Sequence, residues 1–239
     1  MIDFELQYTR FRYYLTYLTD LRYGGFFGGF RKTRYGHLGA HSTMSSYYFV
    51  LSRLFGNFPI KDSDVLVDVG CGRGRVVNWW LRKGCRNRIV GIELDGTIAA
   101  EAQRAFRNYG NVEIVHGNAL GHIPEDGTVF YLYNPFDRDV MTQFKDRVKE
   151  RCTRWNEVRV YYVNCEFLDA FRGDPDWTVA TNCEEFKGDA AWPVRGLDVG
   201  MSYPVAVLEP SAHAIGSRQM DEWGNGTYHL ERVTGVQQG

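Results

Sequence analysis

The sequence predicts an α/β fold in which helices cover both faces of a mostly parallel, seven-stranded sheet. From residue 64 onward, short apolar runs alternate with longer segments of helical periodicity, a pattern typical of repeated β-α units. The first run enters a glycine-rich turn that is followed by a helical pattern. A chain of 239 residues is long enough for one such domain but short for two.

The residues before this pattern predict a helical N-terminal cap over residues 1–60. An amphipathic helix is indicated by apolar residues at three- and four-residue intervals, and it ends at paired glycines. These glycines belong to Gly24–Phe30, which we expect to act as a lid. Ser42 or Thr43 can cap a second helix that Gly56 and Asn57 end. The apolar positions are Phe4, Tyr8, Phe11, Leu15 and Leu18 in the first helix and Met44, Tyr47, Tyr48, Leu51, Leu54 and Phe55 in the second.

The remaining elements follow in chain order, and each strand is a short apolar run. The expected strands are Val65–Val69, Arg88–Glu93, Val112–His116, Thr128–Tyr133, Arg159–Asn164, Thr178–Phe186 and Val199–Leu208. The expected helices are Arg75–Lys83, Thr97–Tyr109, Arg138–Arg151 and Phe167–Arg172. Because Gly188 and Pro193 interrupt residues 187–195, the last two strands form an antiparallel C-terminal hairpin. We therefore expect one domain over residues 61–210 and a tail over 211–239.

Composition excludes several classes of protein. Lys and Arg number 28 against 29 Asp and Glu, so the chain lacks the strong positive field of a dedicated nucleic-acid binder. Five separated cysteines without a C-x-x-C pair predict neither a disulfide framework nor a zinc site. No basic leader with an apolar core and no run of about 18 apolar residues occurs, which favours a cytoplasmic protein without a membrane span.

The stretch with the clearest chemistry is Val65–Val76, where Asp68 precedes three alternate glycines, Gly70, Gly72 and Gly74. Glycines at such a turn let backbone N–H groups and a helix N-terminus approach a nucleotide-like ligand. The dinucleotide fingerprint G-x-G-x-x-G would place glycine where Arg75 stands. The sequence therefore disfavours NAD without excluding it.

This motif resembles the first motif of the class I S-adenosylmethionine-dependent methyltransferases, which have a Rossmann-like fold, and the resemblance spans about residues 60 to 210. It implies that S-adenosyl-L-methionine is the cofactor and that the acidic residue helps to hold its amino group. The implied cofactor contacts in the turn are Asp68, Gly70, Cys71, Gly72 and Gly74. The alternative is a turn that only joins strand to helix.

Two later segments complete the implied cofactor site. Glu93 ends the second strand, where a carboxylate can accept hydrogen bonds from both ribose hydroxyls, and Leu94 follows it. A carboxylate there would also serve NAD, or could simply be solvated. Asn118 and Ala119 lie in a segment resembling the one that contacts adenine in the family, although the family usually has Asp at the position of Asn118. The alternative for Asn118 is a turn residue after Gly117.

The fourth strand ends in Asn134-Pro135-Phe136, which we identify as the candidate catalytic run, with Asn134 also beside the cofactor. The run is similar to the Asn-Pro-Pro-Tyr motif of amino-group methyltransferases, but it lacks one residue, so specificity for nitrogen does not carry over. The alternative is a strand-ending turn. Asp137, Glu166, His37 and His41 are the candidates for a general base. A metal is not expected, because Asn134 and Asn164 stand where a metal-assisted site would need carboxylates.

The predicted function is transfer of a methyl group to oxygen or nitrogen of a small-molecule or glycan-type acceptor. Through residue 35 the cap carries interleaved aromatic residues and three more basic than acidic residues, which could bind an anionic acceptor or could be core and solvated face. The near-zero net charge argues against a nucleic-acid acceptor. Alternatives are methylation of a protein or RNA amino group through the Asn-Pro-Phe run, an NAD-dependent oxidoreductase, and a non-catalytic adenosyl-binding subunit. The oligomeric state is not predicted.

Overall fold

The structure is a computed structural model that describes residues 18, 20–21, 25–180, 184–187 and 202–212. Most of the predicted first helix, the segment between the last two predicted strands and the C-terminal tail lie outside the described residues. No helix in the described ranges is long and apolar enough to cross a membrane.

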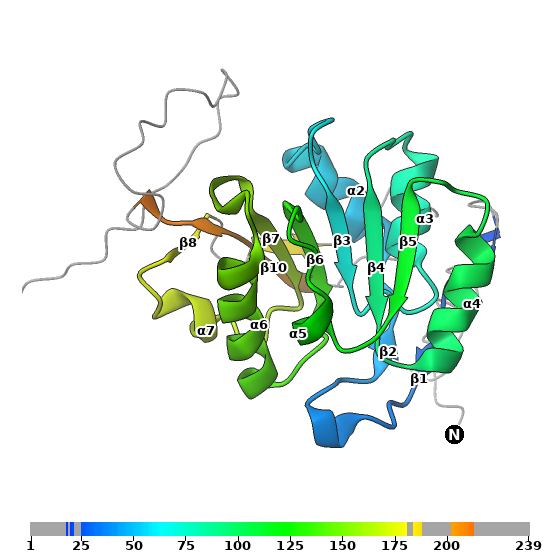
Figure 1. Ribbon diagram of the computed structural model, residues 1–239, viewed down its shortest axis with the longest axis horizontal. Helices are drawn as coiled ribbons and strands as arrows, with labels where there is room; N and C mark the ends of the chain where they lie inside the picture. Colours follow the sequence, from blue (N-terminus) through cyan, green and yellow to red (C-terminus); the bar gives the residue numbers. More distant parts are fainter. Residues whose placement is uncertain (1–17, 19, 22–24, 181–183, 188–201, 213–239) are drawn as a thin grey trace, which may run out of the picture.

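The predicted α/β fold is confirmed by one mixed sheet (Figure 1). Its order is β5-β4-β3-β6-β7-β10-β8, with parallel pairing from β5 to β7 and antiparallel pairing of β10 with β7 and β8. The strands are β3 (Leu66–Val69), β4 (Ile89–Glu93), β5 (Val112–His116), β6 (Val129–Tyr133), β7 (Arg159–Val163), β8 (Trp177–Val179) and β10 (Ser202–Pro210). The single strand expected over 178–186 is wrong, because β9 (Glu184–Lys187) is a separate strand that pairs with the start of β10.

Helices cover both faces of the sheet and enclose two hydrophobic cores (Figure 1). One core lies under α2 (Tyr48–Asn57), α3 (Arg75–Arg82) and α4 (Gly96–Phe106). The other lies under α5 (Ala119–His122), α6 (Arg138–Arg151) and α7 (Asp169–Arg172). Two short 3-10 helices are η1 (Gly36–Leu38) and η2 (Trp155–Glu157). The periodicity of the sequence missed only the shortest of these elements, among them α5, because a single turn carries no repeating pattern.

The expected start of the second cap helix at Ser42 or Thr43 is wrong. The helix α2 begins at Tyr48, and its N-cap residue Tyr47 makes no side-chain capping bond. Thr43 and Met44 instead form β2, which pairs with β1 (Phe30–Arg31) in a two-stranded ribbon. This pairing spans more than ten residues of sequence, so local capping preferences could not reveal it.

Residues 25–44 form a segment, here called the strap, that crosses the carboxyl ends of the parallel strands (Figure 1). The His41 N–H donates to the Pro135 carbonyl at 2.9 Å, and the Asp137 N–H donates to the Gly39 carbonyl at 2.8 Å. Within the expected lid, Phe26 is exposed, but Phe27 is buried and stacks on Phe106 at 5.9 Å between ring centroids. Motion of this loop stays a prediction.

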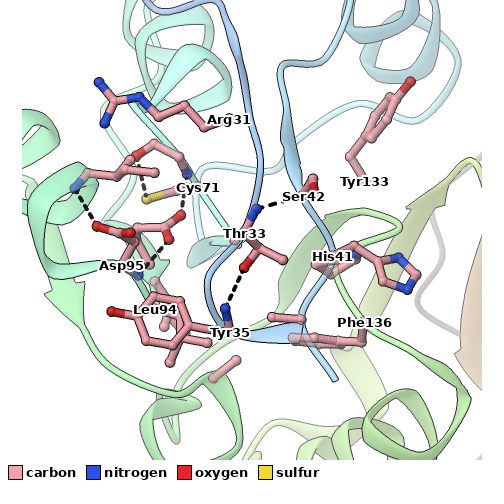
Figure 2. A pocket seen from close by; sticks show the side chains of 18 of the residues that line it. Arg31, Thr33, Tyr35, His41, Ser42, Cys71, Leu94, Asp95, Tyr133 and Phe136 are labelled. Atoms are coloured by element: carbon pink, nitrogen blue, oxygen red, sulfur yellow. Dashed lines mark hydrogen bonds between the residues drawn. The ribbon is translucent and has the colours of Figure 1, made fainter. Parts of the chain in front are cut away.

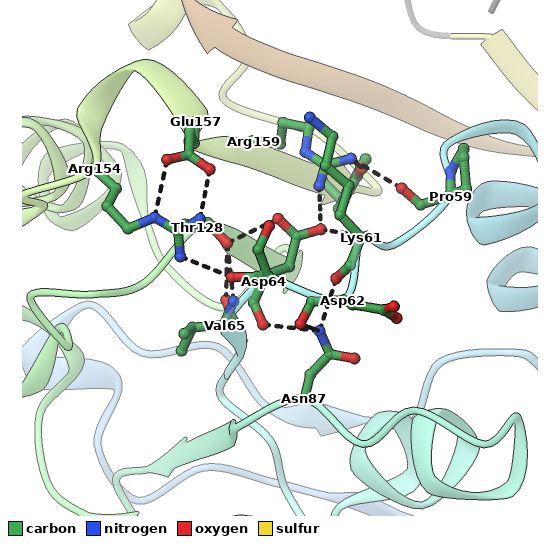
Figure 3. Close-up of polar contacts among 12 residues, drawn as sticks. Pro59, Lys61, Asp62, Asp64, Val65, Asn87, Thr128, Arg154, Glu157 and Arg159 are labelled. Atoms are coloured by element: carbon green, nitrogen blue, oxygen red, sulfur yellow. Dashed lines mark hydrogen bonds and ion pairs between the residues drawn. The ribbon is translucent and has the colours of Figure 1, made fainter. Parts of the chain in front are cut away.

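The opposite, amino-terminal edge of the sheet is closed by a buried polar network around Asp64 (Figure 3). Its carboxylate accepts hydrogen bonds from the Lys61 N–H at 2.7 Å and from the Thr128 hydroxyl at 3.1 Å, and it forms an ion pair with Arg159. The Asn87 amide donates to the Asp64 carbonyl at 2.9 Å. These bonds fix the entry to β3, so the two edges of the sheet differ in role.

Candidate active site

A cavity of about 320 Å³ lies at the carboxyl edge of the parallel strands, with the strap as one wall (Figure 2). Cavities of this size are typical of small-molecule and cofactor sites. The turn after β3, the end of β4, the start of α5, the end of β6 and the strap all contribute lining residues. Of the predicted site residues, the cavity is lined by Asp68, Gly70, Cys71, Gly72, Glu93, Leu94, Asn118, Ala119, Pro135 and Phe136. Gly74 and Asn134 are outside this lining.

The glycine-rich turn has the left-handed backbone that its glycines make possible. Gly70, Gly72 and Gly74 have φ angles of 75°, 55° and 86°. A Cβ on Gly74 would lie 2.2 Å from a ring carbon of Phe106, so this glycine serves the packing of α3 against α4. Gly70 and Gly72 expose their backbone to the cavity, as the predicted cofactor contact requires.

Asp68 brings a buried carboxyl group with incomplete hydrogen bonding to the cavity. The residue is 3% exposed, and its Oδ2 atom has no hydrogen-bond partner in the described part of the chain. Burial, and then the charge of Glu93, raise the pKa of Asp68 well above its ordinary value. A buried carboxylate oxygen without a donor is costly unless a cationic or hydrogen-bonding ligand approaches it. The ammonium group of S-adenosylmethionine fits this requirement.

Glu93 is held by backbone donors that leave it able to bind a ligand. Its Oε2 accepts from the Gly72 N–H at 2.9 Å, and its Oε1 accepts from the Asp95 N–H at 2.8 Å. Burial raises the pKa of Glu93, and these two backbone hydrogen bonds oppose the shift. Each carboxylate oxygen has a further lone pair, which can accept from a ribose hydroxyl. The geometry therefore suits a nucleoside beside the glycine turn.

Asn118 begins α5 rather than standing alone in a turn. Its side-chain oxygen accepts from the Leu120 N–H at 3.0 Å and caps the helix. The second lone pair of that oxygen and the amide NH₂ are the groups of Asn118 that a ligand could use.

The side chain of Asn134 is engaged behind the cavity wall. Its amide donates to Glu166 at 2.9 Å, and its oxygen accepts from the Tyr162 hydroxyl at 2.8 Å. The backbone has a φ angle of 42°, a left-handed conformation that asparagine tolerates better than most residues. The predicted contact of this side chain with the acceptor and the cofactor stays a prediction, and any contact would require the two hydrogen bonds to rearrange.

Two features of the site were not found from the sequence. Arg75, noted only as a departure from the dinucleotide fingerprint, forms a buried ion pair with Asp20 at 2.8 Å and also lines the cavity. The Ser46 hydroxyl accepts from the Tyr131 hydroxyl at 2.8 Å, joining the cap to β6. Both contacts link residues more than fifty positions apart, and no local pattern signals them.

Metal-ligating side chains do not converge in the described ranges: no group of three or more His, Cys, Asp or Glu residues is placed to hold a metal ion. Asn164, which together with Asn134 prompted the expectation of a metal-free site, has a positive φ angle of 53° at the end of β7.

Comparison with known proteins identifies the domain. Residues 66–155 match the family model of a methyltransferase domain. No curated protein sequence matches the chain. Its structure is similar to mitomycin 7-O-methyltransferase at 14% identity and a TM-score of 0.50, over 68% of this chain and 54% of that one. A protein of the NADB-Rossmann superfamily from Streptococcus agalactiae aligns at 10% identity and a TM-score of 0.50, over 70% of each chain.

A third similar structure is the RNA methyltransferase from Salinibacter ruber in complex with S-adenosyl-L-homocysteine, at 19% identity and a TM-score of 0.49, over 70% of this chain and 93% of that one. The chain spans about half the length of the mitomycin 7-O-methyltransferase. The structural likeness establishes the Rossmann-like fold, and the family match establishes the kind of domain. Residues 66–155 thus match a methyltransferase domain, set within a sheet of Rossmann-like fold.

Proposed function

We propose that this protein is an S-adenosylmethionine-dependent methyltransferase and that it transfers the methyl group to an oxygen or nitrogen atom of a small-molecule or glycan-type acceptor. The observation that carries the proposal is the placement of two buried carboxylates, Asp68 and Glu93, on adjacent strands around the glycine turn of one cavity. Asp68 would hold the ammonium group of the donor, and Glu93 would hold its ribose hydroxyls. Leu94, Asn118 and Ala119 would surround the adenine.

The size of the cavity and the net charge of the chain support a compact acceptor. The strap forms one wall of the cavity through Thr33, Tyr35 and His41 (Figure 2). In that view Cys71, Leu94 and Asp95 lie to the left of Thr33, and His41, Tyr133 and Phe136 lie to its right. A polymer would favour an open groove with a strong basic field, whereas the net charge here is −1.

Methyl transfer needs little covalent help from the protein, because the sulfonium donor supplies an activated methyl group when bound. The residues of this chain would align the acceptor in line with that group and exclude water from the cavity. Pro135 and Phe136 would position the acceptor at the end of β6, because both line the cavity there.

The test at residue level is Glu93→Ala. Loss of the carboxylate should weaken S-adenosylmethionine binding by at least about tenfold, since hydrogen bonds to a charged group contribute about 1.5–3 kcal/mol. Isothermal titration calorimetry measures the affinity, and circular dichroism checks the fold. The matched control is Glu113→Ala on the neighbouring strand β5, whose exposed carboxylate pairs with Arg88. Unchanged affinity in Glu93→Ala would remove this residue from the cofactor site.

The acceptor half of the proposal is tested by an acceptor screen with S-adenosylmethionine, followed by mass spectrometry of the products. Methylation of small hydroxyl or amino compounds supports the proposal. Methylation confined to RNA or protein substrates would instead favour the polymer alternative that the Asn-Pro-Phe run raised.

A further inference from the structure

The ring of His41 has a hydrogen-bond partner that selects the tautomer of its neutral form. The Nδ1 atom lies 3.0 Å from the backbone carbonyl oxygen of Asn134. A carbonyl oxygen can only accept, so Nδ1 carries the hydrogen in the neutral ring, and Nε2 keeps its lone pair. His41 also lines the cavity. A histidine base oriented through its other nitrogen is the usual arrangement for proton abstraction.

The position of His41 is fixed from three directions. Its backbone N–H donates to the Pro135 carbonyl at 2.9 Å, and the preceding residue, Ala40, forms an antiparallel bridge with Phe136. The ring packs against Phe167 at 6.1 Å between centroids. Asn134, which holds Nδ1, is itself fixed by its hydrogen bonds to Tyr162 and Glu166. The orientation of the imidazole therefore depends on the end of β6 and not on the strap alone.

This end of β6 lies directly beside the glycine turn. A Cβ built on Gly70 would be 3.2 Å from the Cβ atom of Pro135, so the run that holds His41 contacts the turn of the cofactor site. The run that orients the imidazole and the glycine turn thus line adjacent parts of one cavity.

The other sequence-derived base candidates are engaged or lie elsewhere. Asp137 caps α6 by accepting from the Val140 N–H at 3.0 Å. Glu166 is exposed and accepts from the Asn134 amide. His37 is exposed in η1 and is outside the cavity lining. The carboxylates that do line the cavity, Asp68 and Glu93 among them, lie in the proposed cofactor half.

The surroundings of His41 indicate the kind of acceptor. Beside the basic side chains of the strap, the cavity lining on the strap, at the end of β6 and on α6 includes a set with apolar or aromatic side chains: Leu38, Met44, Tyr133, Phe136 and Val140. Such a lining suits a molecule with an apolar or aromatic body. A base is needed only where the accepting atom still carries its proton, as a hydroxyl does.

We propose that His41 is the general base of the reaction and that the acceptor is a hydroxyl group on an apolar or aromatic small molecule. The acceptor oxygen forms a bond to the methyl carbon while the bond from that carbon to sulfur breaks. The electron pair of the broken carbon–sulfur bond remains on sulfur. The hydroxyl proton moves to Nε2 of His41, which becomes an imidazolium, and solvent later removes this proton. The inference rests on the proposed function and narrows its acceptor class.

The protonation of His41 can be measured without any acceptor. Heteronuclear NMR of protein labelled with ¹⁵N in its histidine rings reports the tautomer, and His41→Gln assigns the signal. The expected result is that the neutral ring carries its hydrogen on Nδ1 and leaves Nε2 without one. A neutral ring with its hydrogen on Nε2 would overturn the proposal. The pH dependence of the His41 signals also reflects the ionisable side chains on the segments packed against the ring. These side chains are Tyr133, Asp137, Arg138 and Glu166.

The catalytic step is tested with two phenols of different acidity, 4-nitrophenol and 4-methylphenol, as probe acceptors. In mildly alkaline buffer the first is ionised and needs no base, whereas the second keeps its proton. His41→Gln should lower kcat with 4-methylphenol by about 100-fold or more and affect 4-nitrophenol far less. In the parent protein, kcat with 4-methylphenol should fall on acidification, and the variant should lose this dependence. His37→Gln, on the same strap, is the matched control and should behave as the parent.

Three outcomes contradict the proposal. Equal losses on both phenols would show a structural role for His41, and full activity of His41→Gln with 4-methylphenol would exclude it as the base. No methylation of either phenol by the parent protein would overturn the acceptor class. Calorimetric titration of the same preparations with S-adenosylmethionine separates these outcomes from failure of the proposed function, because His41→Gln should retain cofactor affinity within about twofold.

Discussion

Asp68 and Glu93 are two buried carboxylates on neighbouring strands, and burial raises the pKa of each. Their charges are unfavourable for the folded protein without ligand, since neither has a cationic partner in the described part of the chain. Sites that bind a cationic ligand commonly carry such a cost. We therefore expect the Asp68 carboxylate to lower the stability of the cofactor-free protein while it raises the affinity for S-adenosylmethionine.

Asp68→Asn should stabilise the protein in the absence of cofactor. Because the folded-state pKa of Asp68 lies above its unfolded value, the folded protein binds more protons between the two values, and the free energy of unfolding falls as pH rises through that window. At neutral pH the variant lacks this penalty and should gain on the order of 1 kcal/mol. The gain should vanish at acidic pH below the unfolded value.

Urea denaturation across pH measures this effect, and calorimetry should show at least about tenfold weaker binding of S-adenosylmethionine by the same variant. The control is Asp62→Asn, whose side chain is exposed. A variant less stable than the parent at neutral pH would mean that the Asp68 charge is compensated in the folded protein.

Residue types and spacing predicted which side chains gather at one cavity, whereas their roles in binding stay predictions. Asp68 and Glu93 line one cavity because they lie at or near the carboxyl ends of adjacent parallel strands, which meet at the same sheet edge. The packing role of Gly74 and the hydrogen bonds of the Asn134 side chain depend on neighbours distant in sequence, namely Phe106, Tyr162 and Glu166. Partners this far away in the sequence produce no local sequence pattern that would predict the contact.

At the scale of elements, the N-terminal segment is joined to the glycine turn by a buried ion pair. Arg75, the first residue of α3, donates through Nε and Nη2 to the carboxylate of Asp20 at 3.0 and 2.8 Å. Asp20 also accepts from the Tyr48 hydroxyl at 2.6 Å and from the Phe27 N–H at 3.2 Å. The pair thus fixes α2, α3 and the start of the strap to one another.

Arg75→Leu should be strongly destabilising. It leaves the fully buried carboxylate of Asp20 without its cation, a change that typically costs about 3–5 kcal/mol. Asp20→Asn in the same chain should recover part of the loss, because the remaining group is neutral. Thermal and urea denaturation measure both effects.

The control for this variant is Arg88→Leu, which removes two exposed ion pairs and should cost about 1 kcal/mol or less. Similar losses in the two arginine variants would contradict the structural role assigned to the Arg75–Asp20 pair.

The elements themselves were predicted where periodicity extends over several turns or residues, as in α4, α6 and the five parallel strands. The ribbon of β1 and β2 was missed because two-residue strands carry no alternation, and their pairing is long-range. The expected strand 178–186 is two separate strands, β8 and β9, for a similar reason: both are too short for alternation to show where one ends and the next begins.

At the scale of the whole molecule, the two edges of the parallel sheet have separate tasks. The amino-terminal edge is closed by the Asp64 network, in which the hydrogen bonds of a buried carboxylate are made within the protein. The carboxyl edge carries the unpartnered oxygen of Asp68, the glycine turn and the strap. Ligands of open α/β sheets bind at this edge, where the strand order reverses beside β3.

The central claim is that this edge binds S-adenosylmethionine, and calorimetric titration of the purified protein tests it most directly. The protein is titrated in parallel with S-adenosylmethionine, S-adenosylhomocysteine and NAD. The account predicts micromolar binding of both sulfur compounds and none of NAD, because the turn carries Arg75 in an ion pair where a dinucleotide site needs glycine. Preference for NAD, or binding of none of the three, would contradict the account.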